Sequence, residues 1–148
     1  ALEDFFIEYK KQDRKPGEFV EKVIVPAKGK NTLFKTYKVS KRFDQDISAV
    51  CAAFAVDVGG GKVKAARLAY GGMAGTPRRA GNAEKALIGK TWGPAAVQEA
   101  MRALADDFTP LTDMRASGGY RAQVAANLLW RFHLETAGSR TERVFAHG

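Results

Sequence analysis

Two sets of positions alternate over residues 50–58, and one set is uniformly hydrophobic. The hydrophobic set comprises Val50, Ala52, Phe54, Val56 and Val58. A period of two residues predicts a half-buried β-strand. Gly59-Gly60-Gly61 then turns the chain, because glycine adopts positive φ without a steric penalty. Residues 63–70 supply a returning strand that ends at Gly71-Gly72, so the pattern predicts a long β-hairpin.

The spacing of hydrophobic residues becomes helical after Pro77. A short helix is predicted around residues 82–88, and a longer one begins at Pro94, where proline suits the first turn. The hydrophobic face of the longer helix is formed by Val97, Ala100, Met101, Leu104 and Phe108. We expect a last helix to begin near Ser117, whose hydroxyl can cap it, and to stop at Gly138.

The first third of the chain has weaker signals. Residues 19–25 have β-branched character and end at Pro26, which predicts a strand, and residues 27–31 are expected to form a loop. The alanine-rich face of the hairpin would let helices approach closely. We therefore predict an α+β fold, with an antiparallel sheet of three to four strands and about three helices packed on one face. Residues 139–148 are expected to be a frayed tail.

Composition and charge narrow the class of protein. A chain of 148 residues with 45% hydrophobic residues is expected to form one soluble domain. Its formal net charge is +8, and the lysines and arginines are concentrated in the first third. Phe34, Tyr37 and Phe43 lie between these lysines and could stack on bases, which makes nucleic acid one candidate partner. No nucleic-acid-binding motif accompanies them, so a solvated charged face is the favoured interpretation and an anionic cofactor is a third one.

Cys51 is the only cysteine, so the chain cannot form an internal disulfide, a thiolate zinc site or its own iron–sulfur cluster. This favours a reducing cytoplasm. The thiol lies in an alanine-rich run and is interpreted as a small core side chain. No apolar stretch reaches membrane-spanning length, and the first residues do not have the pattern of a signal peptide. We therefore expect a cytoplasmic protein with no membrane contact.

Motifs that could carry chemistry have simpler explanations. Gly59-Gly60-Gly61-Lys62 lacks the wider glycine spacing and the Ser or Thr of a P-loop, so a hairpin turn explains it better. Asp44, Asp46 and Asp57 match no metal-binding spacing and are expected in caps and turns. We interpret His133 as structural, placed favourably near the negative end of the last helix.

Asp113 and Arg115 precede the last predicted helix. They could be a functional ion pair, but a clasp that fixes the connection between two helices is the simpler interpretation. The residues alone thus predict a basic α+β domain with no catalytic or metal-binding residue of its own.

Four stretches of the chain resemble, in order, segments of one enzyme family. The stretch TPLTDMRASGGYRAQVAANLLWRF is similar to the P-L-S-D-x-R-A-S-x-x-Y-R signature, followed by N-L-L, of xanthine dehydrogenase and related flavoprotein subunits. The other stretches resemble a passage of basic residues before an aspartate-isoleucine pair, a YGGMA turn, and a passage that ends in I-x-I-P. In this chain they are Tyr37 to Val50, Leu68 to Ala80 and Glu3 to Pro26.

The resemblance implies a molybdenum hydroxylase assembly. Purines or similar heterocycles would be oxidised at a molybdenum cofactor in a partner subunit or domain, two iron–sulfur clusters would carry the electrons, and FAD would pass them to NAD. This chain would hold the end of the FAD-binding domain at residues 1–26 and a CO dehydrogenase flavoprotein C-terminal-like domain at residues 27–148. It would work in a hetero-oligomer with the upstream FAD-binding domain, which holds the FAD pyrophosphate, and would not be catalytic alone.

The resemblance also implies site residues. Lys38 matches a lysine that contacts the flavin, where a cation can stabilise the reduced, anionic ring. Val20 matches an apolar residue near the ring. Tyr9 and Lys10 match a Tyr-Arg pair on the nicotinamide-facing side, although lysine lacks the planar fork of arginine. Asp44 and Gln45 fall in a loop beside the flavin. The alternatives are the flavoprotein of a CO dehydrogenase or aldehyde oxidoreductase-type enzyme, or a basic nucleic-acid-binding module.

Overall fold

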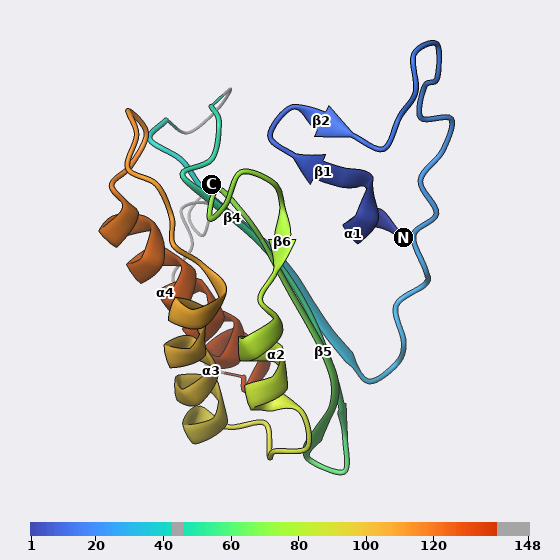
Figure 1. Cartoon of the computed structure of the whole chain (residues 1–148). Helices are drawn as coiled ribbons and strands as arrows, with labels where there is room; N and C mark the ends of the chain where they lie inside the picture. Colours follow the sequence, from blue (N-terminus) through green and yellow to red (C-terminus); the bar gives the residue numbers. More distant parts are fainter. Residues whose placement is uncertain (43–45, 139–148) are drawn as a thin grey trace.

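The computed structural model describes residues 1–42 and 46–138 (Figure 1). In chain order its helices and strands are α1 (Leu2–Phe5), β1 (Phe6–Glu8), β2 (Lys11–Gln12), β3 (Thr32–Val39), β4 (Val50–Gly59), β5 (Lys62–Gly71), β6 (Arg78–Arg79), α2 (Gly81–Leu87), α3 (Pro94–Asp107) and α4 (Gly118–Thr136).

The main sheet is antiparallel, with the strand order β3-β4-β5-β6, and β1 and β2 form a separate small ribbon. The predicted hairpin is confirmed as β4 and β5. Its turn contains Gly60 and Gly61 at φ values of 60° and 74°, which glycine adopts readily. Since each strand follows its neighbour along the chain, the sheet needs only short connections.

Helices α2, α3 and α4 cover one face of the main sheet, whereas the opposite face looks toward the N-terminal segment (Figure 1). The core lies between sheet and helices, where Phe54 of β4 packs against Tyr70 of β5 and Phe132 of α4 with ring centroids 5.2 and 5.4 Å apart. All three side chains are almost fully buried. The predicted α+β architecture, with helices on one face, is confirmed.

The predicted helix ends are also confirmed. Pro94 lies in the first turn of α3, and the hydroxyl of Ser117 accepts a hydrogen bond from the Tyr120 N–H at 3.2 Å to cap α4. Gly138 follows α4 with a φ of 83°. The helices therefore start and stop where their capping residues direct them.

His133 is structural, but for a different reason from the one expected. It is buried near the end of α4, with ring centroids 5.4 Å from Trp92 and 5.5 Å from Trp130. Burial lowers the pKa of His133, so its neutral form is favoured. The buried position of His133 therefore favours the uncharged imidazole ring, whereas the negative end of a helix would favour the imidazolium cation.

Two predictions are wrong. Residues 19–25 pair with no described strand and are exposed, with Phe19 and Ile24 each 81% accessible. β-Branched residues favour a strand only where a neighbouring strand pairs with them. Cys51 is exposed and not in the core, because the two-residue period of β4 directs it to the face without helices. The expected frayed tail lies outside the described residues.

Candidate functional site

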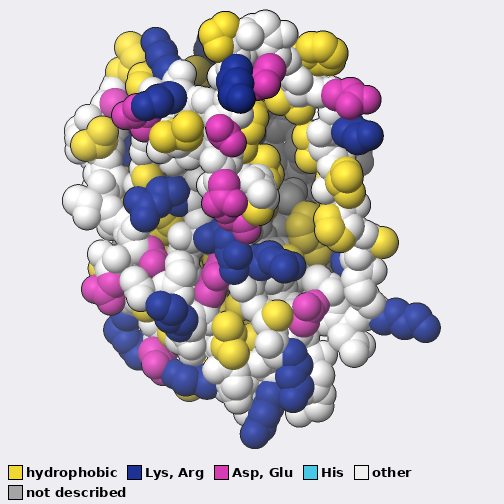
Figure 2. Space-filling view, turned by 45° about the vertical axis from the view of Figure 1, so that its right-hand side comes forward, with side chains coloured by type: hydrophobic (Ala, Val, Ile, Leu, Met, Phe, Trp, Pro, Cys, Tyr) yellow, Lys and Arg dark blue, Asp and Glu magenta, His cyan; other side chains and the backbone are white. Residues whose placement is uncertain are grey.

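The candidate site lies on the face of the main sheet that the helices leave uncovered, here called the outer face. Small side chains dominate it on the two central strands. They are Cys51, Ala53 and Ala55 on β4 and Ala65, Ala69 and Gly71 on β5. Lysine and arginine side chains are spread over the surface seen in Figure 2, from its upper to its lower edge. The row of small side chains on the outer face, here called the platform, has exposed Lys38 on β3 and exposed Arg67 on β5 beside it.

Lys38 stands at one end of this platform. It is exposed near the end of β3, opposite Cys51 of β4, which in turn is opposite Gly71 of β5. Within the described part of the chain, Lys38 has no hydrogen-bond or ion-pair partner. The residues beside Lys38 across the sheet are thus Cys51, with a short thiol side chain, and Gly71, with no side chain. This leaves room for a flat ligand beside the ammonium group of Lys38.

The Tyr9-Lys10 pair borders the same end of the platform. It forms the turn between β1 and β2, where Lys10 has a φ of 62° and its Nζ lies 5.5 Å from the centroid of the Tyr9 ring. A Cβ added to Gly75 would lie 3.8 Å from the Tyr9 Cβ. Since Gly75 belongs to the loop that follows Gly71, the β1-β2 ribbon brings Tyr9 toward the Lys38 end of the sheet.

The other expected site residues are not brought to this place. Val20 is 55% exposed and lines a separate hollow with Phe5 and Arg14. Asp44 and Gln45 lie outside the described residues. The structure thus places Lys38 and Tyr9 at one end of the platform and Val20 away from it.

Arg121 was missed by the sequence analysis. It is 4% exposed, and its Nη1 donates to the carbonyl oxygens of Ala49 and of Gly72, the second at 2.9 Å. Its Nη2 donates to Asp113 Oδ1 at 2.7 Å. One buried guanidinium therefore joins three of the stretches that carry the family resemblance, next to the end of the sheet that holds Lys38.

Asp113 is held by more than the predicted pair with Arg115. Its Oδ1 accepts hydrogen bonds from the backbone N–H groups of Arg115 at 2.8 Å and Ala116 at 3.1 Å, in addition to Arg121. These bonds, the Arg115 N–H first, lower the pKa of Asp113 to about 2. The guanidinium of Arg115 is more distant, at 3.6 Å. The expected clasp exists, but Arg121 is its main cation.

The described residues have no metal-binding cluster of three or more His, Cys, Asp or Glu side chains. No helix within the same residues is long and apolar enough to cross a membrane. Of the aspartates expected in caps and turns, Asp46 lies in the loop after β3 and accepts from the Arg42 N–H at 3.0 Å. Asp57 lies within β4 and not in a turn, because it pairs with Thr32 of β3 and accepts from the Thr32 hydroxyl. What the outer face offers is a cation beside a flat, small-residue surface.

The fold defines a class of α+β domain in which helices cover one side of a four-stranded antiparallel sheet, and here the other side faces the N-terminal segment. The chain belongs to the CO dehydrogenase flavoprotein C-terminal domain family, which it matches over residues 35–136. The resemblance found in the sequence motifs is thereby confirmed.

Several characterised proteins are similar to most of this chain. A nicotinate hydroxylase of Emericella nidulans is 34% identical over 138 residues, which cover 88% of this chain and 10% of that protein. A xanthine dehydrogenase of the same organism is 33% identical, with coverages of 89% and 10%. The glyceraldehyde dehydrogenase medium chain of Sulfolobus acidocaldarius is 32% identical, with coverages of 90% and 47%. The chain therefore spans between a tenth and a half of these relatives.

Solved structures agree with this assignment. A carbon monoxide dehydrogenase chain from Hydrogenophaga pseudoflava is 28% identical with a TM-score of 0.76, over 86% of this chain and 44% of that one. Quinoline 2-oxidoreductase from Pseudomonas putida 86 shares the fold, with 24% identity, a TM-score of 0.77 and coverages of 93% and 47%. The chain corresponds to the carboxy-terminal part of the flavoprotein domain or subunit of molybdenum hydroxylases.

Proposed function

We propose that this chain closes one side of the flavin pocket in a xanthine dehydrogenase-type molybdenum hydroxylase, and that an upstream domain holds the rest of the FAD. The observation that carries the proposal is the position of Lys38, an exposed cation beside the small residues Cys51 and Gly71, whose ammonium group has no partner among residues 1–42 and 46–138. A planar ring can lie flat only where side chains are short, so the residues present fit a flavin ring.

Lys38, Tyr9 and Lys10 are the residues that would border the ring. When bound, FAD would supply the exchange of electrons between the iron–sulfur clusters of partner subunits and a soluble acceptor, here proposed to be NAD. Lys38 would contribute positive potential at the ring edge, and Tyr9 would shield that edge from water. Arg121 fixes the start of β4 and the turn after β5 through the Ala49 and Gly72 carbonyl groups, so it positions the surface.

The substrate class follows from the relatives. Xanthine dehydrogenase and nicotinate hydroxylase act, by their names, on nitrogen heterocycles, and both are more than 30% identical to this chain. We therefore propose a heterocycle, a purine above all, as the substrate oxidised in the partner subunit. The CO dehydrogenase and glyceraldehyde dehydrogenase relatives make a different molybdenum site the alternative.

The nucleic-acid alternative loses support from the geometry. Tyr37, one of the aromatic residues proposed to stack on bases, is half-buried and its hydroxyl donates to Glu135 at 3.2 Å. Lys35 forms an ion pair with Glu135 at 3.4 Å, and Lys41 donates to the Met114 carbonyl oxygen at 2.7 Å. The basic run is thus partly used inside the domain and does not form one continuous track.

The test begins with the protein purified gently from its source. Native mass spectrometry should find this sequence with larger partners, and the visible spectrum should show flavin and iron–sulfur absorption. A colourless protein that runs alone would overturn the proposal.

In the FAD-loaded assembly, Lys38→Gln should lower the flavin reduction potential by about 30 mV, which for a two-electron couple is a tenfold change in equilibrium. Lys85→Gln is the matched control, because Lys85 is an exposed lysine of α2 on the helical side of the sheet. Equal potentials in the two variants would remove Lys38 from the flavin site.

A further inference from the structure

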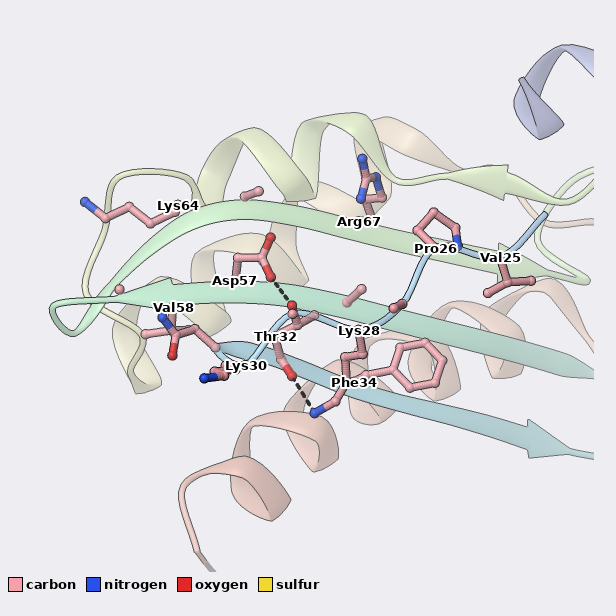
Figure 3. Close-up of a pocket in the computed structure, with 16 residues that line it drawn as sticks. Val25, Pro26, Lys28, Lys30, Thr32, Phe34, Asp57, Val58, Lys64 and Arg67 are labelled. Carbon is pink, nitrogen blue, oxygen red and sulfur yellow. Dashed lines mark hydrogen bonds between the residues drawn. The ribbon is translucent and has the colours of Figure 1, made fainter.

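A second hollow lies on the outer face, at the end of the sheet opposite Lys38. It is a groove of about 650 Å³ between residues 25–31 and the strands β3, β4 and β5 (Figure 3). Ala55 and Ala65 form part of its floor. Thr32, which lines it, begins β3, and Lys38 lies about 20 Å farther along that strand at about 3.4 Å per residue. The groove is therefore separate from the proposed flavin site.

Cations outnumber anions in this groove. The charged residues that line it are Lys28, Lys30, Lys64 and Arg67, with Asp57 as the carboxylate. Lys28 donates to the Thr32 carbonyl oxygen at 3.2 Å, and Asp57 accepts from the Thr32 hydroxyl. The side chains of Lys30, Lys64 and Arg67 have no hydrogen-bond or ion-pair partner within the described part of the chain. The groove thus holds a net positive charge with cations available to an anionic ligand.

The strand register adds a slot for a flat ring. Phe34, Ala55 and Arg67 are direct neighbours on β3, β4 and β5, so the Cα atoms of Phe34 and Arg67 are about 10 Å apart, with the Ala55 methyl group between them on the sheet and residues 25–31 lining the other side of the groove. Figure 3 shows the two side chains on either side of β4. Phe34 is 51% exposed. An aromatic ring and a guanidinium group both stack on the faces of nucleobases.

We propose that this groove binds a nucleoside diphosphate. The base would lie over Ala55 between Phe34 and Arg67, and the diphosphate would extend toward Lys30 and Lys64 near the β4-β5 turn. A Cβ at Gly59 would lie 3.4 Å from the Lys64 side chain, so this lysine passes close over a backbone without a side chain. The groove gathers Lys30, Lys64 and Arg67 within one hollow, which is the size of site that a single nucleotide needs, whereas a nucleic-acid strand requires a continuous positive track.

Calorimetric titration of the 148-residue chain with ADP and with inorganic pyrophosphate tests the proposal. ADP should bind at one site, more weakly as salt is raised. Lys64→Gln should weaken ADP binding about fivefold, the effect of losing one charge-assisted contact to phosphate. Lys85→Gln removes an equal charge from the helical side and should leave binding unchanged. Phe34→Ala should weaken binding of ADP but not of pyrophosphate, because only ADP carries a base.

Four results would overturn the proposal: no ADP binding at millimolar concentration, equal losses in Lys64→Gln and Lys85→Gln, equal effects of Phe34→Ala on ADP and pyrophosphate, or tighter binding of a single-stranded oligonucleotide than of ADP. Circular dichroism and thermal unfolding of each variant confirm that the fold is intact. The flavin proposal does not depend on these results, because Lys38 is not part of the groove.

Discussion

Gly72 occupies a position at the end of β5 that no other residue type can fill without strain. Its φ is 81°, and a Cβ there would fall against the Ala49 carbonyl oxygen and lie 3.0 Å from Arg121 Nη1. Gly72→Ala should lower the free energy of unfolding by about 2–4 kcal/mol, through backbone strain and displacement of the guanidinium. Urea denaturation measures the change.

Gly119→Ala is the control for Gly72. Gly119 lies in the first turn of α4, and a Cβ there would meet no atom within 4 Å. Alanine should be neutral or stabilise the helix by up to about 1 kcal/mol. Equal destabilisation by the two substitutions would show that Arg121 and the Ala49 carbonyl group yield to the new methyl group.

Asp113 should make stability depend on pH in the acid range. Hydrogen bonds lower its pKa in the folded state from 3.8 to about 2, so its stabilising effect is complete above about pH 4 and is lost as the pH falls toward 2. Asp113→Asn should lower the urea midpoint at pH 6, and the difference from the unsubstituted protein should shrink below pH 4. A difference that stays constant down to pH 2 would assign the effect to geometry alone.

Single residues were the level at which sequence reasoning failed most. Asp113 was recognised, but the sequence suggested Arg115 as its partner because only Met114 separates the two. Arg121 lies in the first turn of α4, where an arginine side chain usually faces solvent. It is buried here because its side chain packs against the start of β4 and the end of β5. The signal that could have found it is the motif itself, in which Arg121 follows Tyr120 at a fixed place.

Among the elements, the edge of β5 depends on a helix. β6 pairs with β5 at only Ala69 and Tyr70, and next to them the Leu68 N–H donates to Glu84 Oε1 of α2 at 2.8 Å. Arg79 of β6 holds the same carboxylate at 2.6 Å. The Glu84 side chain, 6% exposed, therefore continues the hydrogen bonding of β5 at the residue where its pairing with β6 ends.

Replacing Glu84 by alanine should cost about 2–4 kcal/mol of stability, because the buried Leu68 N–H loses its acceptor and the Arg79 guanidinium keeps only the longer contacts to Glu3 and the Ala66 carbonyl oxygen. Hydrogen exchange of the Leu68 amide should accelerate in the same variant. Glu99→Ala, which removes an exposed helical carboxylate paired with Lys90, is the control and should have little effect. Similar losses in both variants would contradict the special role of Glu84.

The elements themselves were largely predictable, since their signals are local. Alternation defines β4, and proline and serine at the helix starts define α3 and α4. The strand expected over residues 19–25 failed because its formation needs a partner strand, which no local pattern reports. The cations of the groove, Lys28 and Lys64, could not be associated from the sequence either, because a loop and a distant strand bring them together.

For the whole molecule, Cys51 reports whether the outer face is covered. It is the only cysteine, it is exposed, and it lies opposite Lys38. The thiol should react readily with Ellman's reagent in the isolated chain and at least about tenfold more slowly in the FAD-loaded assembly, since covering a thiol limits its access. Equal rates in the two samples would show that the partner domain and the flavin leave the Cys51 end of the sheet open.

Helix α4 is one continuous helix that connects the two ends of the sheet. Its 19 residues span about 28 Å. Near the start of α4, Arg121 donates to the carbonyl oxygens of Ala49 and Gly72. At the end of α4, the Thr136 hydroxyl accepts a hydrogen bond from the ring N–H of Trp92. The backbone N–H of Trp92 in turn donates to the Gly61 carbonyl oxygen in the β4-β5 turn at 3.0 Å. The Lys38 end and the groove end therefore have a fixed separation, and neither can shift along the helix unless α4 bends or moves as a unit.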